Sequence, residues 1–159
     1  MTTLQSASRR RRAVAVAGAV SAGLLVLSAC DKPTPVATVT VGDSSVSSEA
    51  ICYNDGNGLN ADSLKECAKK AGDVKSIKLG QDETVRIGVD PKIADDGWII
   101  LVNGRQFSDL SKQTFRTMPS GAFFSEQYGT QGNTNTITIQ MGDKAPAKGL
   151  WSFKVKKDF

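Results

Sequence analysis

Histidine is absent from the 159 residues of this chain. The absence excludes a Ser-His-Asp triad, a Cys-His nucleophile and histidine-ligated zinc, because each of these sites needs an imidazole. A long uncharged apolar run occurs only at residues 13–27, which leaves no candidate membrane span elsewhere. We therefore predict a protein that is not an enzyme and that needs no cofactor or metal ion.

The first 29 residues have the layout of an export signal. Four arginines at residues 9–12 precede the apolar run at residues 13–27. That run is shorter than the roughly 20 residues of a spanning helix and has the length of a signal-peptide core. It ends in Leu27-Ser28-Ala29-Cys30.

This tetrapeptide resembles the lipobox of bacterial lipoproteins. The resemblance implies transfer of a diacylglyceryl lipid to the Cys30 thiol, cleavage between Ala29 and Cys30, and a mature chain that begins at Cys30. An ordinary secretory signal or a retained anchor helix is the alternative, and the arginines leave both the Sec and the twin-arginine export routes open. We expect a protein anchored by its lipid to the outer face of the cell membrane.

Removal of this signal changes the charge of the chain. The whole chain holds 20 Lys and Arg against 16 Asp and Glu, and four of the arginines lie within residues 1–29. The remainder is neutral, so we expect no nucleic-acid partner. Residues 30–35, the lipidated cysteine and a stretch with two prolines, form a short tether. It should hold a single domain, residues 36–159, close to the bilayer.

Three cysteines would leave one unpaired if all of them entered disulfides. If Cys30 carries lipid, Cys52 and Cys67 remain as a pair in an oxidising compartment, where disulfides form. A bridge between them closes a loop of about 15 residues and stabilises the fold by roughly 3 kcal/mol in the chain-entropy account. Two free, buried thiols are the alternative.

The remainder of the sequence is predicted to be mainly β. Alternating or continuous apolar residues indicate strands over residues 36–41, 46–53, 76–79, 84–89, 98–102, 105–107, 115–118, 136–141 and 150–156. Asn103-Gly104 predicts a two-residue hairpin turn, because both positions tolerate a positive φ. Short strands separated by turns favour an antiparallel β-sandwich.

One short α-helix is expected, over about residues 60–71. Asn60 can cap its first turn. Its apolar side should face the sheet, which would bring Cys67 within reach of Cys52. That side consists of Ala61, Leu64, Cys67, Ala68 and Ala71.

Two resemblances bear on the fold. Trp98, in a central strand with hairpins on either side, resembles the immunoglobulin-like arrangement, although both paired cysteines precede it. The lipobox, the two cysteines, residues 84–90, the Gly97-Trp98 pair and the closing Leu150-Trp151-Ser152-Phe153 resemble a family of small actinobacterial lipoproteins known only as a domain of unknown function. This likeness covers nearly all of residues 30–157. It implies location and a β-rich domain, and no activity.

The strongest candidate for a binding site is an aromatic loop. Aromatic side chains around a Pro-Ser-Gly turn can form a recognition surface or a small apolar pocket, with an arginine as polar handle. The alternative is that the two adjacent phenylalanines plug one end of the sandwich. The candidate residues are Phe115, Arg116, Phe123, Phe124 and Tyr128.

Two functional hypotheses follow. The first is a membrane-anchored, non-catalytic binding or accessory domain whose partner is an unknown envelope protein or ligand. The alternative is a cell-envelope enzyme or small-ligand carrier that uses the loop near Phe123 or the carboxylates near Asp95. Asp90, Asp95 and Asp96 lie close together, as acid/base carboxylates do, but Asp-Pro and Asp-Gly pairs are also ordinary turn sequences.

Overall fold

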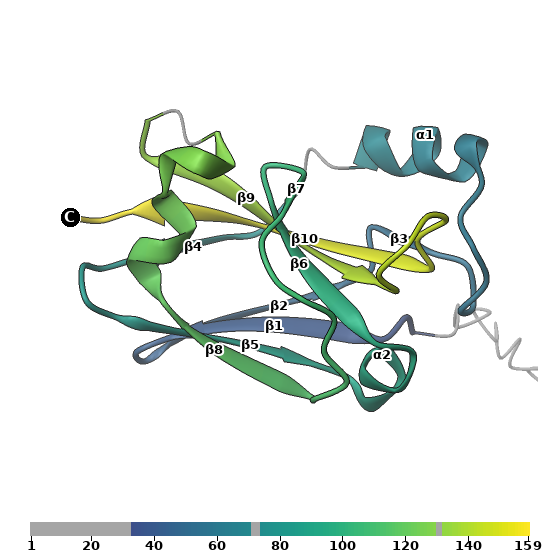
Figure 1. Cartoon of the computed structure of the whole chain (residues 1–159), viewed down its shortest axis with the longest axis horizontal. Helices are drawn as coiled ribbons and strands as arrows, with labels where there is room; N and C mark the ends of the chain where they lie inside the picture. Colours follow the sequence, from purple (N-terminus) through teal and green to yellow (C-terminus); the bar gives the residue numbers. More distant parts are fainter. Residues whose placement is uncertain (1–32, 71–73, 130–131) are drawn as a thin grey trace, which may run out of the picture. The chain divides into compact units, whose positions relative to one another are not determined.

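The computed structural model describes residues 33–70, 74–129 and 132–159, so the predicted signal peptide and Cys30 lie outside the described residues. Its strands form a β-sandwich of two sheets (Figure 1). The first sheet has the order β2 (Ser44–Glu49), β1 (Val36–Val41), β5 (Thr84–Val89) and β8 (Phe115–Pro119). The second has the order β3 (Cys52–Tyr53), β10 (Gly149–Lys157), β9 (Thr134–Met141), β6 (Trp98–Val102) and β7 (Arg105–Gln106), and β4 (Ser76–Leu79) also pairs with β10.

Alternation along the strands places their apolar residues inside. In β1, Ala37 and Val39 are fully buried, because successive side chains of a strand point to opposite faces. On the outer face, the Thr38 hydroxyl hydrogen-bonds to that of Ser47 at 2.8 Å, across the β1–β2 pair. The predicted strands with this alternation are therefore confirmed.

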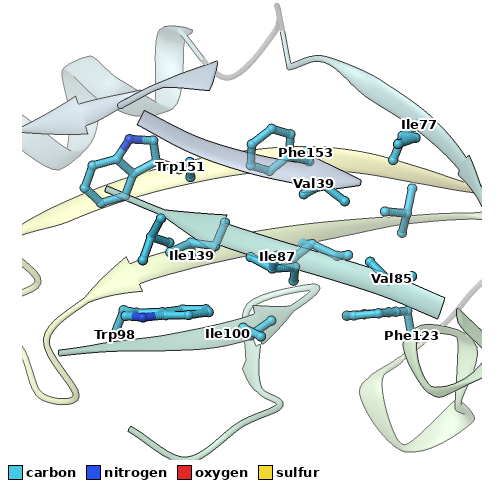
Figure 2. Packing of buried hydrophobic residues seen from close by; sticks show 14 of the residues in the cluster. Val39, Ile77, Val85, Ile87, Trp98, Ile100, Phe123, Ile139, Trp151 and Phe153 are labelled. Carbon is cyan, nitrogen blue, oxygen red and sulfur yellow. The ribbon is translucent and has the colours of Figure 1, made fainter. Parts of the chain in front are cut away.

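The core lies between the two sheets (Figure 2). Its largest members, Trp98, Trp151, Phe123 and Phe153, are all fully buried. Burial of a side chain of this size contributes about 1.5–3 kcal/mol. Both indole N–H groups donate to backbone carbonyls, that of Trp98 to Gln113 at 2.8 Å and that of Trp151 to Pro35 at 2.7 Å. The polar atom of each tryptophan is thus satisfied inside the core.

The predicted hairpin turn joins β6 to β7. Asn103 has φ 49° and Gly104 has φ 79°, which is the pair of positive values that a type I′ turn requires. Asn103 also holds the turn against β9, because its Oδ1 accepts from the backbone N–H of Thr136 at 2.9 Å and its Nδ2 donates to Asn135 at 2.9 Å.

Two features of the sheets differ from the sequence prediction. Residues 46–53, expected as one strand, divide between β2 in the first sheet and β3 in the second. The pair β4–β10 is parallel, with Ile77 opposite Val155, whereas the other strand pairs are antiparallel. Pairing direction depends on where the chain returns in space, which local alternation does not encode. The immunoglobulin-like assignment stays a prediction.

The helices are also more numerous than predicted. The expected helix is α1 (Ala61–Lys70), and its predicted last residue, 71, lies outside the described residues. A second helix, α2 (Pro91–Asp96), which the sequence analysis did not predict, follows β5. Proline suits the first position of a helix, because its missing N–H is not needed there. Two 3-10 segments, η2 (Ser120–Phe124) and η3 (Glu126–Tyr128), follow β8.

Candidate functional site

The predicted aromatic loop is largely part of the core. Phe123 is fully buried and stacks on Phe107, with ring centroids 4.9 Å apart. Tyr128 also packs against Phe107, with 5.0 Å between the two ring centroids. The Phe123 backbone carbonyl accepts a hydrogen bond from Asn135 at 2.7 Å. This segment closes one end of the sandwich, as the alternative interpretation held.

The other predicted loop residues lie apart from this cluster. Phe115 is 54% exposed at the start of β8, where the Arg86 guanidinium lies 5.9 Å from its ring centroid. Arg116 donates to the Asp109 carbonyl at 2.8 Å. Phe124 is half-buried and contacts the Phe159 ring edge-on at 6.1 Å. The five residues therefore do not converge on one exposed surface.

Two of the three clustered aspartates have structural partners. Asp90 Oδ2 accepts a hydrogen bond from the backbone N–H of Val36 at 2.7 Å, which ties the start of β1 to the end of β5. Asp96 forms an ion pair with Lys148 at 2.6 Å. Asp95, between them in the chain, is exposed on α2. The structure thus separates these carboxylates into different roles.

The disulfide predicted between Cys52 and Cys67 is present and ties α1 to β3. The Asn60 side chain caps α1, accepting from the Ser63 backbone N–H at 2.8 Å. The loop before α1 is fixed in turn, because the Leu59 backbone N–H donates to Ala147 at 2.8 Å. The helix is thus positioned by a covalent bridge at one end and a hydrogen-bonded loop at the other.

The orientation of α1 differs from the prediction. Its apolar side was expected to face the sheet, but Ala61 is exposed and Leu64 is 40% exposed. Cys67 reaches the sandwich through its bridge to Cys52. The disulfide holds α1 beside the second sheet, and a hollow lies along each flank of the helix.

One of these hollows, hereafter the apolar groove, has a volume of about 580 Å³. Among the side chains that the structure describes, its lining carries no charged one and a single polar one, Gln140. It is walled by α1, by the β9–β10 loop and by the ends of those strands, and its lining residues are Leu59, Ala61, Leu64, Gln140, Ala145, Pro146, Ala147 and Leu150. Sequence reasoning missed this surface, although the uncharged run Ala145-Pro146-Ala147 was a signal for it.

Close contact between the two loops shapes the groove. A side chain at Gly58 would meet the Pro146 ring, since an added Cβ would lie 2.5 Å from its Cγ. Glycine therefore permits the chain before α1 to approach the β9–β10 loop. Leu59, directly after it, is buried at 3% exposure and lines both hollows.

The other hollow, hereafter the polar hollow, has a volume of about 510 Å³ and lies on the β3 flank of α1. Its lining includes the disulfide, Thr34, and the acidic residues Asp62 and Glu66. No group of three or more His, Cys, Asp or Glu side chains suited to a metal ion occurs within the described part of the chain. The two flanks of α1 therefore differ in chemistry, one acidic and one apolar.

Lys92 of α2 is held by an aromatic ring at the same end of the domain. Its Nζ lies 5.3 Å from the centroid of Tyr53, which is within the range of a cation–π contact. The adjacent Tyr53 side chain raises the pKa of Lys92 above its ordinary value. Tyr53 itself packs against Trp151 at 6.2 Å between centroids. This ammonium group is thus charged and engaged with β3.

The segment before β1 is part of the folded domain from residue 34 onward. Thr34 Oγ1 accepts from the Ala50 backbone N–H at 2.9 Å, and the Pro35 carbonyl accepts from Trp151 Nε1 at 2.7 Å. Since Thr34 also lines the polar hollow, the chain enters the domain beside α1.

Within the described residues, no helix combines the length and apolar character needed to cross a membrane. Searches of protein-family models, of curated proteins and of solved structures found no match to this chain.

Proposed function

We propose that this chain is an exported lipoprotein, anchored through lipid on Cys30 to the outer face of the cell membrane, with a non-catalytic binding or accessory domain. One observation carries the proposal: the folded domain begins at Thr34, only four residues after Cys30 in the sequence. Thr34 and Pro35 are already hydrogen-bonded to the domain. The four residues from Cys30 to Thr34 extend at most about 14 Å. A domain on so short a tether acts at the bilayer surface.

Further support comes from the order of the sequence before the domain. Arginines, an uncharged apolar run and the Leu27–Cys30 lipobox follow one another as in a lipoprotein precursor. Lipidation of Cys30 also accounts for the odd cysteine, since the other two are joined to each other. The likeness to small actinobacterial lipoproteins of unknown function belongs to the same proposal.

A non-catalytic role is supported by the use that the fold makes of its polar groups. The chain has no histidine to serve as a general base. Asp90 and Asp96, two of the three candidate acid/base carboxylates, bind a backbone N–H and Lys148 respectively. An apolar groove lies beside α1, which suits contact with another surface better than it suits chemistry.

Anchoring is tested by the maturation of the Cys30→Ala protein. We expect this variant, and the wild-type protein in cells whose lipoprotein signal peptidase is blocked, to accumulate as a heavier precursor on intact-mass spectrometry. The wild-type protein should begin at Cys30 and carry added acyl mass. Normal maturation of the variant, or a mature wild-type chain with another first residue, would contradict the proposal.

The binding role is tested by cross-linking in live cells. A photoreactive residue at Leu64, beside the apolar groove, is compared with one at Phe159, which has similar exposure, 40% against 48%. We expect an envelope component to be captured from the first position in excess over the second. Equal capture at both positions, or recovery of the protein alone, would count against a binding domain that uses the α1 end.

A further inference from the structure

We propose that the apolar groove beside α1 docks on the bilayer that holds the lipid anchor. This inference rests on the proposed function, since it takes the lipid on Cys30 as given. It adds an orientation: the α1 end of the domain lies in the membrane interface, and the opposite end points away from it.

The first argument is the character of the groove. Single exposed apolar residues are common on proteins, whereas apolar residues gathered around one hollow are typical of binding sites. Here Ala61 and Leu64 of α1 face Ala145 and Pro146 of the β9–β10 loop, all with exposed side chains, and none of the described side chains that line the space between them is charged. Such a surface enters the interface without placing a charge in a medium of low dielectric.

The second argument is the position of the tether. Thr34 lines the polar hollow, and Leu59 lines both that hollow and the apolar groove. Lipid on Cys30 is held within about 14 Å of Thr34 by the length of the intervening chain. The bilayer is therefore within reach of the groove for geometric reasons.

Attachment at this point also lowers the affinity that the groove needs in order to stay docked on the bilayer. A second contact made by an already tethered domain is effectively intramolecular, with an effective concentration of about a millimolar or more for a short linker. An apolar surface too small to bind vesicles from solution can then stay docked. The lipid supplies the attachment, and the groove supplies the orientation.

The two flanks of α1 decide which side faces the lipid. Asp62 and Glu66 line the polar hollow on one flank, whereas Ala61 and Leu64 line the apolar groove on the other. Burial of carboxylates in lipid is unfavourable. We therefore expect the flank with Leu64 to contact the bilayer and the acidic flank to stay in water.

The test measures contact of one side chain with lipid chains. The lipidated Leu64→Trp protein is reconstituted into phosphatidylcholine–phosphatidylglycerol vesicles with brominated acyl chains, which quench tryptophan. Trp98 and Trp151 are fully buried and supply a constant background. The matched control is Phe159→Trp, because Phe159 is 48% exposed and lies at the end of the domain opposite α1 (Figure 1). Ala61→Trp serves as a second probe of the groove should Leu64→Trp not fold.

We expect the added Leu64→Trp emission to fall at least twofold in brominated relative to plain vesicles and to shift to the blue, with no change for Phe159→Trp. If brominated lipid quenches the two probes equally, in vesicles with which the protein still floats, docking would be overturned and the anchor would stand. Failure to float with vesicles would overturn the anchor and docking together. Saturable quenching of the same probe by monomeric brominated fatty acid, in the Cys30→Ala background without vesicles, would overturn docking in favour of a free-lipid site.

Discussion

Removal of the Cys52–Cys67 disulfide should loosen α1 and lower the free energy of unfolding of the whole domain. The bridge joins residues with a sequence separation of 15, for which the chain-entropy account gives a stabilisation of roughly 3 kcal/mol. A helix of 10 residues is too short to persist in water without tertiary contacts. Since Leu64 is 40% exposed, packing supplies little of that contact, and the bridge supplies most of it.

The perturbation is the double variant Cys52→Ala and Cys67→Ala, and the assay is urea unfolding followed by fluorescence. Trp98 and Trp151 are fully buried and report on the core. We expect the free energy of unfolding to fall by up to about 3 kcal/mol. The fall is smaller than this limit if α1 becomes disordered in the native state of the variant, because that disorder adds conformational entropy to the native state. Hydrogen exchange should show rapid exchange of α1 amides while the amides of β9 and β10 stay protected.

Reduced wild-type protein is the control, because it lacks the bridge and keeps both sulfur atoms. It should behave as the double variant does. A free energy of unfolding within about 0.5 kcal/mol of the oxidised protein, the scatter of neutral substitutions, together with unchanged protection of α1, would refute the reasoning. In that case packing alone would position the helix and the apolar groove.

Four further substitutions, one of them a control, test other parts of the structure by urea unfolding. Phe123→Ala should lower the free energy of unfolding by about 3–5 kcal/mol, because it empties a buried site, whereas Phe115→Ala on the surface should change it by no more than about 0.5 kcal/mol. Similar losses for the two variants would support the predicted aromatic surface that both residues share. Asn60→Ala should cost about 1 kcal/mol through the lost cap, with faster amide exchange in α1, and unchanged exchange would contradict the capping role. Gly104→Ala should cost about 1 kcal/mol, because Gly104 has φ 79° in open space; no loss would mean that the turn changes type.

Several elements could be predicted because their signals are local. Alternation in β1, β5, β9 and β10 follows from the two-residue period of a strand facing one core. The turn at Asn103-Gly104 was predictable because few residue pairs accept two positive φ values. The pairing of Cys52 with Cys67 followed from the cysteine count once Cys30 was assigned to lipid.

Other features had weak or misleading signals. Asp90-Pro91 was interpreted as a turn, yet proline at the first helical position equally begins α2. Residues 46–53 form two strands because the chain crosses between sheets near Ala50, and a crossing leaves no periodic mark. The aromatic residues near Phe123 were ambiguous, since exposed and buried aromatic clusters have the same composition.

The amino-acid sequence by itself determined the strands, the helix cap, the hairpin turn and the cysteine pair, because each depends on residues a few positions apart or on a simple count. Only the tertiary structure decided the parallel β4–β10 pair, the burial of Phe123 and the outward apolar flank of α1. These depend on which distant segments meet. The disulfide holds α1 beside the sandwich, and the β9–β10 loop, some 80 residues later in the chain, completes the groove. That juxtaposition has no counterpart in any local pattern.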